Sequence, residues 1–102
     1  MDWKHVCAVA DVPSGGMKQF ETEDGILVLL LNSGDEYHAC QAICPHQDTP
    51  LEEGMFDGST LTCHQHLWQW EIETGEPKGL AEMPLERFEL KRENDAFYVR
   101  LP

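Results

Sequence analysis

Apolar and polar residues alternate over short stretches of this chain, and no stretch repeats apolar residues at the i, i+3, i+4, i+7 spacing of an amphipathic helix. The pattern therefore predicts strands and turns. Gly, Pro, Asn and Asp mark turns at residues 13–16, 33–35, 57–59, 74–77 and 94–95. The strands predicted between these turns are His5–Val9, Lys18–Thr22, Ile26–Asn32, Tyr37–Ile43, Thr60–Cys63, Leu67–Ile72, Arg87–Lys91 and Phe97–Leu101.

Two of these segments indicate the architecture. The run Ile-Leu-Val-Leu-Leu-Leu at residues 26–31 shows no alternation, which is typical of a central strand that is covered on both faces. Near the end of the chain, Phe97 and Val99 alternate with polar residues, as do Phe88 and Leu90, on either side of a turn at 93–95. This predicts a terminal hairpin. The fold class that follows is all-β, a sandwich or small barrel of antiparallel sheets.

The chain length allows one compact domain. With 102 residues, 41% hydrophobic and 25% charged, the composition suits a folded globular chain. No repeat, linker or low-complexity tract divides it, so a single domain spanning residues 1–102 is predicted.

The charge excludes several classes of partner. A formal net charge of −12 repels phosphate backbones and anionic lipid, so neither nucleic acid nor a membrane is an expected partner. The longest apolar run is far below the ~20 residues that span a bilayer, and the first residues lack the features of an export signal. A cytoplasmic protein is predicted. In that reducing compartment, the four cysteines favour metal binding or catalysis over disulfides.

Two short segments carry metal-ligand residues. The first reads Cys44-Pro45-His46-Gln47, the second reads Cys63-His64-Gln65-His66, and sixteen residues, 47–62, separate His46 from Cys63. Zinc sites usually take both thiolates of a pair from one knuckle, whereas here each segment offers one Cys and one His. This distribution suits a dinuclear cluster with two thiolates on one iron and two imidazoles on the other. A zinc-stapled interaction module is the alternative of a different class.

With C-x-H, sixteen residues, and then C-x-x-H, the chain resembles the Rieske [2Fe–2S] proteins over nearly its whole length. Cys-Pro-His-Gln and His-Leu-Trp at 66–68 look most like the ferredoxin components of bacterial aromatic oxygenases, the toluene monooxygenase type being nearest. The resemblance implies that Cys44 and Cys63 hold the inner iron, and His46 and His66 the outer one. It also implies a Rieske-type β-sandwich with a cluster-binding subdomain, whose binding loops are residues 43–53 and 63–67 and whose covering loop is 80–84.

The same resemblance implies a function. The chain would be a one-electron carrier that takes electrons from an NADH-dependent flavin and iron–sulfur reductase and passes them to a terminal diiron hydroxylase acting on aromatic hydrocarbons. The ferredoxin of a Rieske-type ring dioxygenase is the alternative. The chain itself is not expected to be an enzyme, because no catalytic arrangement stands apart from the four ligands. It is expected to be a monomer when free.

The resemblance also predicts a low reduction potential. In high-potential members, each binding loop has an additional Cys, and Ser and Tyr hydroxyls lie near the cluster sulfur or the ligand sulfur. Those positions are taken here by Thr49, Gln65, Trp68 and Trp70, respectively. With fewer donors to stabilise the added electron, the potential should lie toward the low end of the range of about −150 to +300 mV.

The remaining candidates are docking residues and bystanders. Candidate docking residues are Gln47, Trp68, Met83 and Pro84, although Trp68 and Trp70 also fit core positions. Carboxylates near the first loop, which are Asp48, Glu52, Glu53 and Asp57, are predicted to steer the chain toward basic partners. Cys7 and Cys40 are expected to be buried, inert thiols, and His5, His38 and His64 to have no ligand role.

Overall fold

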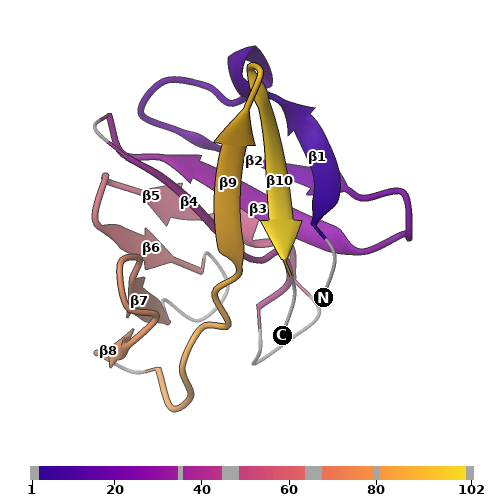
Figure 1. Ribbon diagram of the computed structural model, residues 1–102. Coiled ribbons are helices and arrows are strands. Elements are labelled where there is room, and N and C mark those ends of the chain that lie inside the picture. The colour runs from indigo at the N-terminus through magenta and orange to yellow at the C-terminus, as the bar shows by residue number, and fades with distance from the viewer. Residues whose placement is uncertain (1–2, 35, 45–48, 64–67, 80, 101–102) are drawn as a thin grey trace.

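The computed structural model describes residues 3–34, 36–44, 49–63, 68–79 and 81–100 (Figure 1). Within these ranges the chain forms short strands and two 3₁₀ turns, and the strands make three antiparallel sheets. The all-β prediction is confirmed. The described part of the chain contains no helix that is long and apolar enough to cross a membrane.

The first sheet joins the two ends of the chain. It has the order β1 (Lys4–Ala8), β10 (Ala96–Arg100) and β9 (Glu89–Glu93). Asn94 and Asp95 connect β9 to β10 with φ of 52° and 65°, the two positive angles that a type I′ hairpin turn requires. The predicted terminal hairpin is therefore confirmed.

The first strand of this hairpin begins later than predicted. Arg87 forms an isolated bridge with Cys40, and the amide of Phe88 donates a hydrogen bond of 3.0 Å to the carbonyl of Ala39. Residues 87 and 88 are thus paired with the edge of β4 instead of with β10. Their alternation could not reveal this difference, because an apolar residue fits either partner.

The second sheet has the order β2 (Met17–Glu21), β3 (Leu27–Asn32) and β4 (Tyr37–Gln41). Its central strand β3 is covered on both faces, as its unbroken apolar run predicts. Val28 and Leu30 belong to one core, shared with Phe97 and Val99 of the first sheet. Leu29 and Leu31 belong to a second core on the opposite face.

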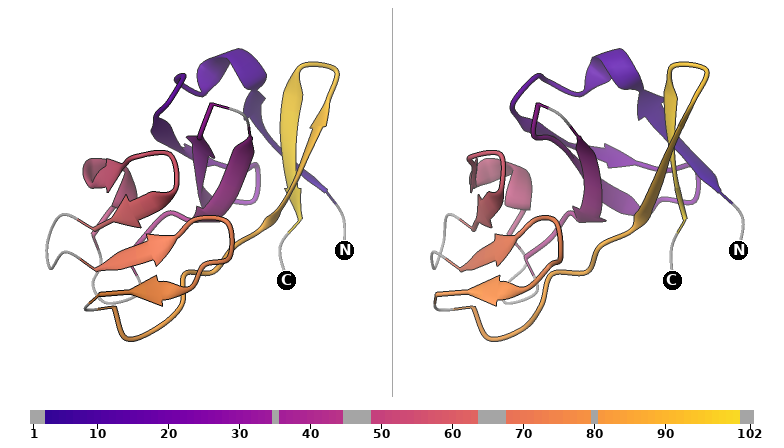
Figure 2. Two further views of the ribbon diagram at one scale, coloured as in Figure 1. Left: turned by 90° about the vertical axis from the view of Figure 1, so that its left-hand side faces the viewer. Right: turned by 60° about the vertical axis from the view of Figure 1, so that its left-hand side comes forward.

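The third sheet covers that opposite face. It has the order β5 (Met55–Phe56), β6 (Thr60–Thr62), β7 (Gln69–Glu71) and β8 (Pro77–Lys78). Figure 2 shows it on the far side of the second sheet from the first. The sequence pattern missed β5 and β8, and also the 3₁₀ turns η1 (Val9–Asp11) and η2 (Leu51–Glu53). Strands of two residues and single 3₁₀ turns are too short to show a period.

The core between the second and third sheets contains the two candidate cysteine ligands. Its members come from β3, β4, β6, β7 and the segments that precede and follow these strands, and Trp70 at 0% exposure is the largest. The buried members are Leu29, Leu31, Cys40, Ala42, Cys44, Leu51, Leu61, Cys63, Trp68, Trp70, Ile72 and Leu85.

Candidate metal centre

Two backbone hydrogen bonds define the candidate site. The amide of Cys44 donates to the carbonyl of Thr49 at 2.9 Å, and the amide of Cys63 donates to the carbonyl of Trp68 at 2.8 Å. In each case the partner is five residues further along the chain, so the two segments are closed in the same way. We call these two closures the Cys44 neck and the Cys63 neck.

Each neck continues a strand of a different sheet. The Cys44 neck follows β4, and beside it Ile43 and Pro50 form an isolated antiparallel bridge. The Cys63 neck follows β6 directly, since that strand ends at Thr62. Rigid pairing on both sides of each loop is what positions ligand residues reproducibly.

Both cysteines are buried in the same core. Cys44 is 4% exposed and Cys63 is 1% exposed, and both belong to the core between the second and third sheets. Two thiols from distant parts of the chain are thus brought into one apolar environment. Thiolates are soft ligands that suit iron, and a dry surrounding protects such a centre from solvent.

The predicted histidine ligands lie outside the described residues. Residues 45–48 include Pro45, His46, Gln47 and Asp48, and residues 64–67 include His64, Gln65 and His66. Each of these segments stands in the sequence between the two ends of one neck. Among the residues that are described, no group of three or more metal-ligand side chains occurs.

Trp70 connects the site to the predicted covering loop. Its indole nitrogen donates a hydrogen bond of 2.9 Å to the backbone carbonyl of Met83, and its ring contacts Trp68 edge-on, with 6.2 Å between the ring centroids. The indole N–H of this fully buried ring is therefore hydrogen-bonded to the backbone just before Pro84. Met83 is 43% exposed and Pro84 is exposed, as docking residues must be.

Trp68 needs a different description. The sequence left open whether it is a core residue, a shield or part of the contact surface, and the structure leaves only 5% of it exposed. Its ring packs in the core with Cys44 and Cys63. The burial favours the core and shielding interpretations over an exposed docking contact, because a side chain this buried offers a partner almost no surface.

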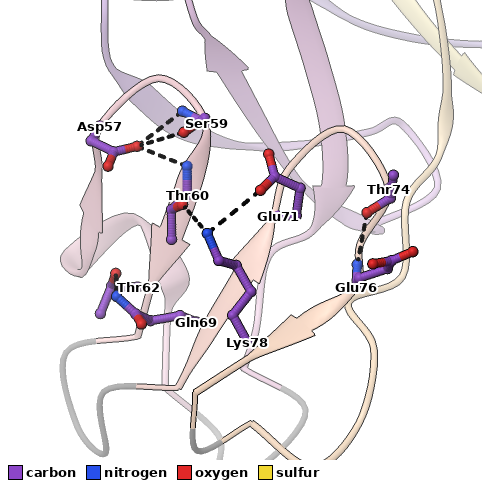
Figure 3. Close-up of polar contacts among 9 residues, drawn as sticks. All are labelled: Asp57, Ser59, Thr60, Thr62, Gln69, Glu71, Thr74, Glu76 and Lys78. Carbon is purple, nitrogen blue, oxygen red and sulfur yellow. Dashed lines mark hydrogen bonds and ion pairs between the residues drawn. The ribbon is translucent and has the colours of Figure 1, made fainter.

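Hydrogen bonds on the third sheet hold the hairpin that leads to Cys63 (Figure 3). The carboxylate of Asp57 accepts from the amides of Ser59 and Thr60 at 3.0 and 2.8 Å. These hydrogen bonds hold the pKa of Asp57 below its usual value. Asp57 therefore serves the turn between β5 and β6 as well as contributing negative charge.

A second set of contacts joins β6, β7 and β8 on the face opposite the core (Figure 3). The side-chain amide nitrogen (Nε2) of Gln69 donates to the hydroxyl of Thr62 at 3.2 Å. Lys78 donates to the hydroxyl of Thr60 at 3.0 Å and forms an ion pair of 3.5 Å with Glu71. Because Thr62 directly precedes Cys63 and Gln69 directly follows Trp68, their contact reinforces the Cys63 neck. No pattern in the sequence indicates this pairing.

The carboxylates near the first loop are exposed, but one of them also has a structural contact. Glu52 accepts a hydrogen bond of 2.8 Å from the amide of Gln19, which connects η2 to β2. Glu53 and Asp57 are exposed as well, and Asp48 lies outside the described residues. The described carboxylates therefore contribute their charge at the surface.

Cys7 is buried in the core between the first and second sheets, whereas Cys40, on β4, is buried in the same core as Cys44 and Cys63. Burial raises the pKa of the Cys7 thiol to about 11, with a further contribution from Asp11, and burial raises the pKa of Cys40 as well. A thiol that resists ionisation is a poor nucleophile and a poor metal ligand. His5 is exposed and contacts the Tyr98 ring, whereas His38 is buried in β4.

Comparison with known proteins settles which family this arrangement belongs to. Residues 2–89 match the family model of the Rieske [2Fe-2S] domain. The chain belongs to this family. As a Rieske protein it carries a Rieske-type [2Fe–2S] cluster, and the pair of buried cysteines fits the thiolate half of the donor set that such a cluster needs.

Several Rieske relatives are ferredoxin components of oxygenase systems. The chain is 39% identical over 95 residues to the methanesulfonate monooxygenase ferredoxin subunit of Methylosulfonomonas methylovora, covering 92% of this chain and 76% of that one. It is 35% identical over 94 residues to the ferredoxin component of the alkene monooxygenase system of Xanthobacter autotrophicus, covering 91% and 76%.

A solved structure agrees with these relatives. It is described as the complex of reduced oxygenase and oxidized ferredoxin in carbazole 1,9a-dioxygenase, and the matched chain has a TM-score of 0.84 and 28% identity, with 95% of this chain and 91% of that chain covered. The Rieske-type fold expected from the sequence is thereby confirmed. Resemblance to the toluene monooxygenase type in particular stays a prediction.

Proposed function

We propose that this Rieske protein is the one-electron carrier of a multicomponent oxygenase system. It receives an electron from an NADH-dependent reductase bearing flavin and an iron–sulfur centre, and delivers it to a terminal oxygenase. Its chain binds no organic substrate and breaks no bond. Three kinds of finding support this: the family, relatives that are ferredoxin components, and a likeness to a chain from an oxygenase–ferredoxin complex.

One observation carries the proposal. Cys44 and Cys63 lie in one core, each closing a loop by the same five-residue backbone bond. His46 stands within the first loop and His66 within the second. We propose these four residues as the ligands, with the cysteines on the inner iron and the histidines on the outer one.

The described residues around the cluster site have different roles. When bound, the cluster takes up and releases a single electron. The necks fix the backbone at Cys44 and Cys63, and Trp68 and Leu51 exclude water from the core beside them. Trp70 holds the backbone at Met83, so that the exposed residues 83–84 are kept in place beside the site. Met83, Pro84 and Gln47 are the proposed docking residues.

The ligand set is tested by substitution with a matched control. His46→Ala and His66→Ala should each abolish or strongly reduce the iron and sulfide bound per chain and the EPR signal that follows reduction with dithionite. His5→Ala, an exposed histidine on β1, should leave both unchanged. A fully assembled, EPR-active cluster in either ligand variant would contradict the assignment.

The electron-transfer function is tested by reconstitution. The purified protein, its oxygenase and its reductase are combined with NADH, and substrate turnover is measured with and without this component. Turnover should require the carrier in catalytic amounts. Equal turnover in its absence would contradict the proposal, whatever the ligand variants show.

We also propose the type of the terminal oxygenase and its class of substrate. A diiron hydroxylase acting on an aromatic hydrocarbon follows from the resemblance of the binding loops, and the monooxygenase names of two relatives support the monooxygenase half of it. A Rieske-type ring dioxygenase is the second candidate, which the carbazole dioxygenase complex favours. Reconstitution with one oxygenase of each type separates them, because only the true partner should give turnover at low carrier concentration.

Zinc as a structural staple is tested by a simpler measurement. The proposed carrier is coloured, and its absorption should bleach on reduction with dithionite, since both sulfide and thiolate transfer charge to ferric iron. A colourless protein with one zinc per chain would contradict the electron-carrier proposal and favour the zinc-stapled interaction module. Monomeric behaviour in solution and a cytoplasmic location belong to the same proposal.

A further inference from the structure

Gly54 lies at a close backbone approach between the segment that leaves the Cys44 neck and the segment that enters the Cys63 neck. It follows η2 (Leu51–Glu53) and precedes β5. A Cβ atom placed on Gly54 would lie 2.0 Å from the carbonyl oxygen of Thr62, 3.1 Å from its carbonyl carbon and 3.2 Å from the carbonyl oxygen of Leu51. Side chains do not tolerate such a contact with backbone, so only glycine fits without a shift of one of the two segments.

The need for glycine here comes from space and not from a positive φ. Gly54 has a φ of −86°, which other residues adopt readily. Gly15 and Gly34 show the reverse requirement, since each has a positive φ and nothing within 4 Å of the place where a Cβ atom would stand. At Gly54 it is therefore steric room, and not a left-handed φ, that selects glycine.

The two segments that meet at Gly54 adjoin the two necks: one leaves the Cys44 neck, and the other enters the Cys63 neck. Thr62 immediately precedes Cys63. On the other side, the amide of Gly54 donates to the carbonyl of Leu51 at 2.9 Å, and the amide of Leu51 donates to the carbonyl of Ala42 at 2.8 Å. Ala42 lies two residues before Cys44. A short path of backbone contacts thus connects one cysteine with the other.

We propose that Gly54 is a positioning residue for the cluster: its bare Cα lets the exit of the Cys44 neck pack against the carbonyl that enters the Cys63 neck, and this sets the separation of the two thiolates. The inference deepens the proposed function and rests on Cys44 and Cys63 as ligands. It assigns to Gly54 no contact with the cluster itself.

The packing of the rest of the core supports a local effect. Leu51, at 0% exposure, fills the core beside Cys44 and Cys63, and a displaced η2 would move this side chain out of its place. Among the described residues, the core between the first and second sheets has no member from η2, β5 or β6. A shift at Gly54 should therefore disturb the cysteine pair before it disturbs that second core.

The test is Gly54→Ala, compared with Val99→Ala. Val99 is fully buried in the other core, so its truncation lowers stability without touching either neck. Each holoprotein is assayed for iron and sulfide per chain, for the EPR g values after dithionite reduction, and for the rate of iron loss to a chelator. Backbone hydrogen exchange of β9 and β10 reports whether the first sheet remains folded.

For Gly54→Ala we expect shifted g values and roughly tenfold faster iron loss, the size of effect that residues supporting metal ligands typically show. The exchange of β9 and β10 should stay protected. Val99→Ala should keep the wild-type g values and iron content although it unfolds more easily. A merely structural role for Gly54 would make the two variants alike.

Two results would overturn the inference. One is a Gly54→Ala protein that holds its cluster with wild-type g values and a wild-type rate of iron loss. The other is a Gly54→Ala chain whose β9 and β10 lose protection, because the contact would then serve the whole fold. Neither result touches the ligand assignment, which fails if either His46→Ala or His66→Ala keeps an intact cluster.

Discussion

The indole nitrogen of Trp70 lies 2.9 Å from the carbonyl oxygen of Met83 and donates its hydrogen bond there. Trp70 occupies the sequence position at which high-potential Rieske proteins, to judge from the resemblance, place a tyrosine whose hydroxyl reaches a ligand sulfur. An indole has a single N–H donor, and in Trp70 this donor is already hydrogen-bonded to the Met83 carbonyl. A hydrogen bond to sulfur from this position is therefore not available to stabilise a reduced cluster.

Trp70→Phe should leave the reduction potential nearly unchanged, because the lost N–H does not serve the sulfur. The same variant should be less stable by roughly 1–3 kcal/mol, because the carbonyl of Met83 loses its donor. Voltammetry gives the first quantity and urea unfolding the second. A clear fall in potential with unchanged stability would mean that the indole acts on the cluster after all.

The wild-type potential itself should be low. Trp68 and Trp70 are buried without a hydroxyl. The resemblance implies that Thr49 and Gln65 stand where high-potential members have the two cysteines of a disulfide between the loops. Protein-film voltammetry should give a value below about +100 mV, within the family range of about −150 to +300 mV. A higher value would show that other donors, such as backbone amides of the loops, dominate.

Electron transfer to the oxygenase should slow several-fold as salt is raised, since screening weakens attraction between an acidic carrier and a basic partner. Glu53→Gln near the Cys44 neck should lower the rate at low salt and flatten this dependence. Glu93→Gln makes the same change of charge on β9, in the first sheet, and should have a smaller effect. The steering hypothesis would be contradicted by a transfer rate that does not change with ionic strength, or by equal effects of the two variants.

Acid should destabilise the fold in part through His38. Burial, and secondarily the charge of Arg87, lowers the pKa of this imidazole from 6.5. The negative charges of Glu36 and Glu73 act in the opposite direction but are weaker. The unfolded chain then binds the proton more readily than the folded one, so this contribution to stability is complete above pH 6.5 and is lost as the pH falls below it. His38→Gln should therefore show a smaller loss of its urea midpoint between about pH 7 and pH 5 than wild type does. The exposed His5→Gln serves as the control, and an unchanged pH profile in His38→Gln would contradict the prediction.

Cys7 and Cys40 should resist alkylation in the folded protein. Their pKa values are raised by burial, and at about pH 8 almost none of either thiol is ionised and accessible. Peptide mapping after iodoacetamide treatment of the holoprotein should find both unmodified, and denaturation should make both reactive. Modification of either in the native state would show that its strand opens.

Much of the fold could be predicted because its decisive patterns are local. The unbroken apolar run at 26–31 is typical of a strand covered on both faces, and β3 is buried in this way between two cores. Asn94 and Asp95 supply the positive φ that the last hairpin needs. Strands of two residues leave no such record, which is why β5 and β8 were missed.

The sequence by itself supplied the proposed donor set: two Cys and two His stand at a spacing that resembles the Rieske pattern, and the Rieske family model that matches residues 2–89 implies the [2Fe–2S] cluster. Only the tertiary structure decided how the cysteines meet and what surrounds them. The five-residue closures, the burial of Trp68, the donor of Trp70 turned to Met83, and the close approach at Gly54 all depend on how the segments fold back on one another. Such contacts follow from how sheets pack, and packing has no period that a single segment could display.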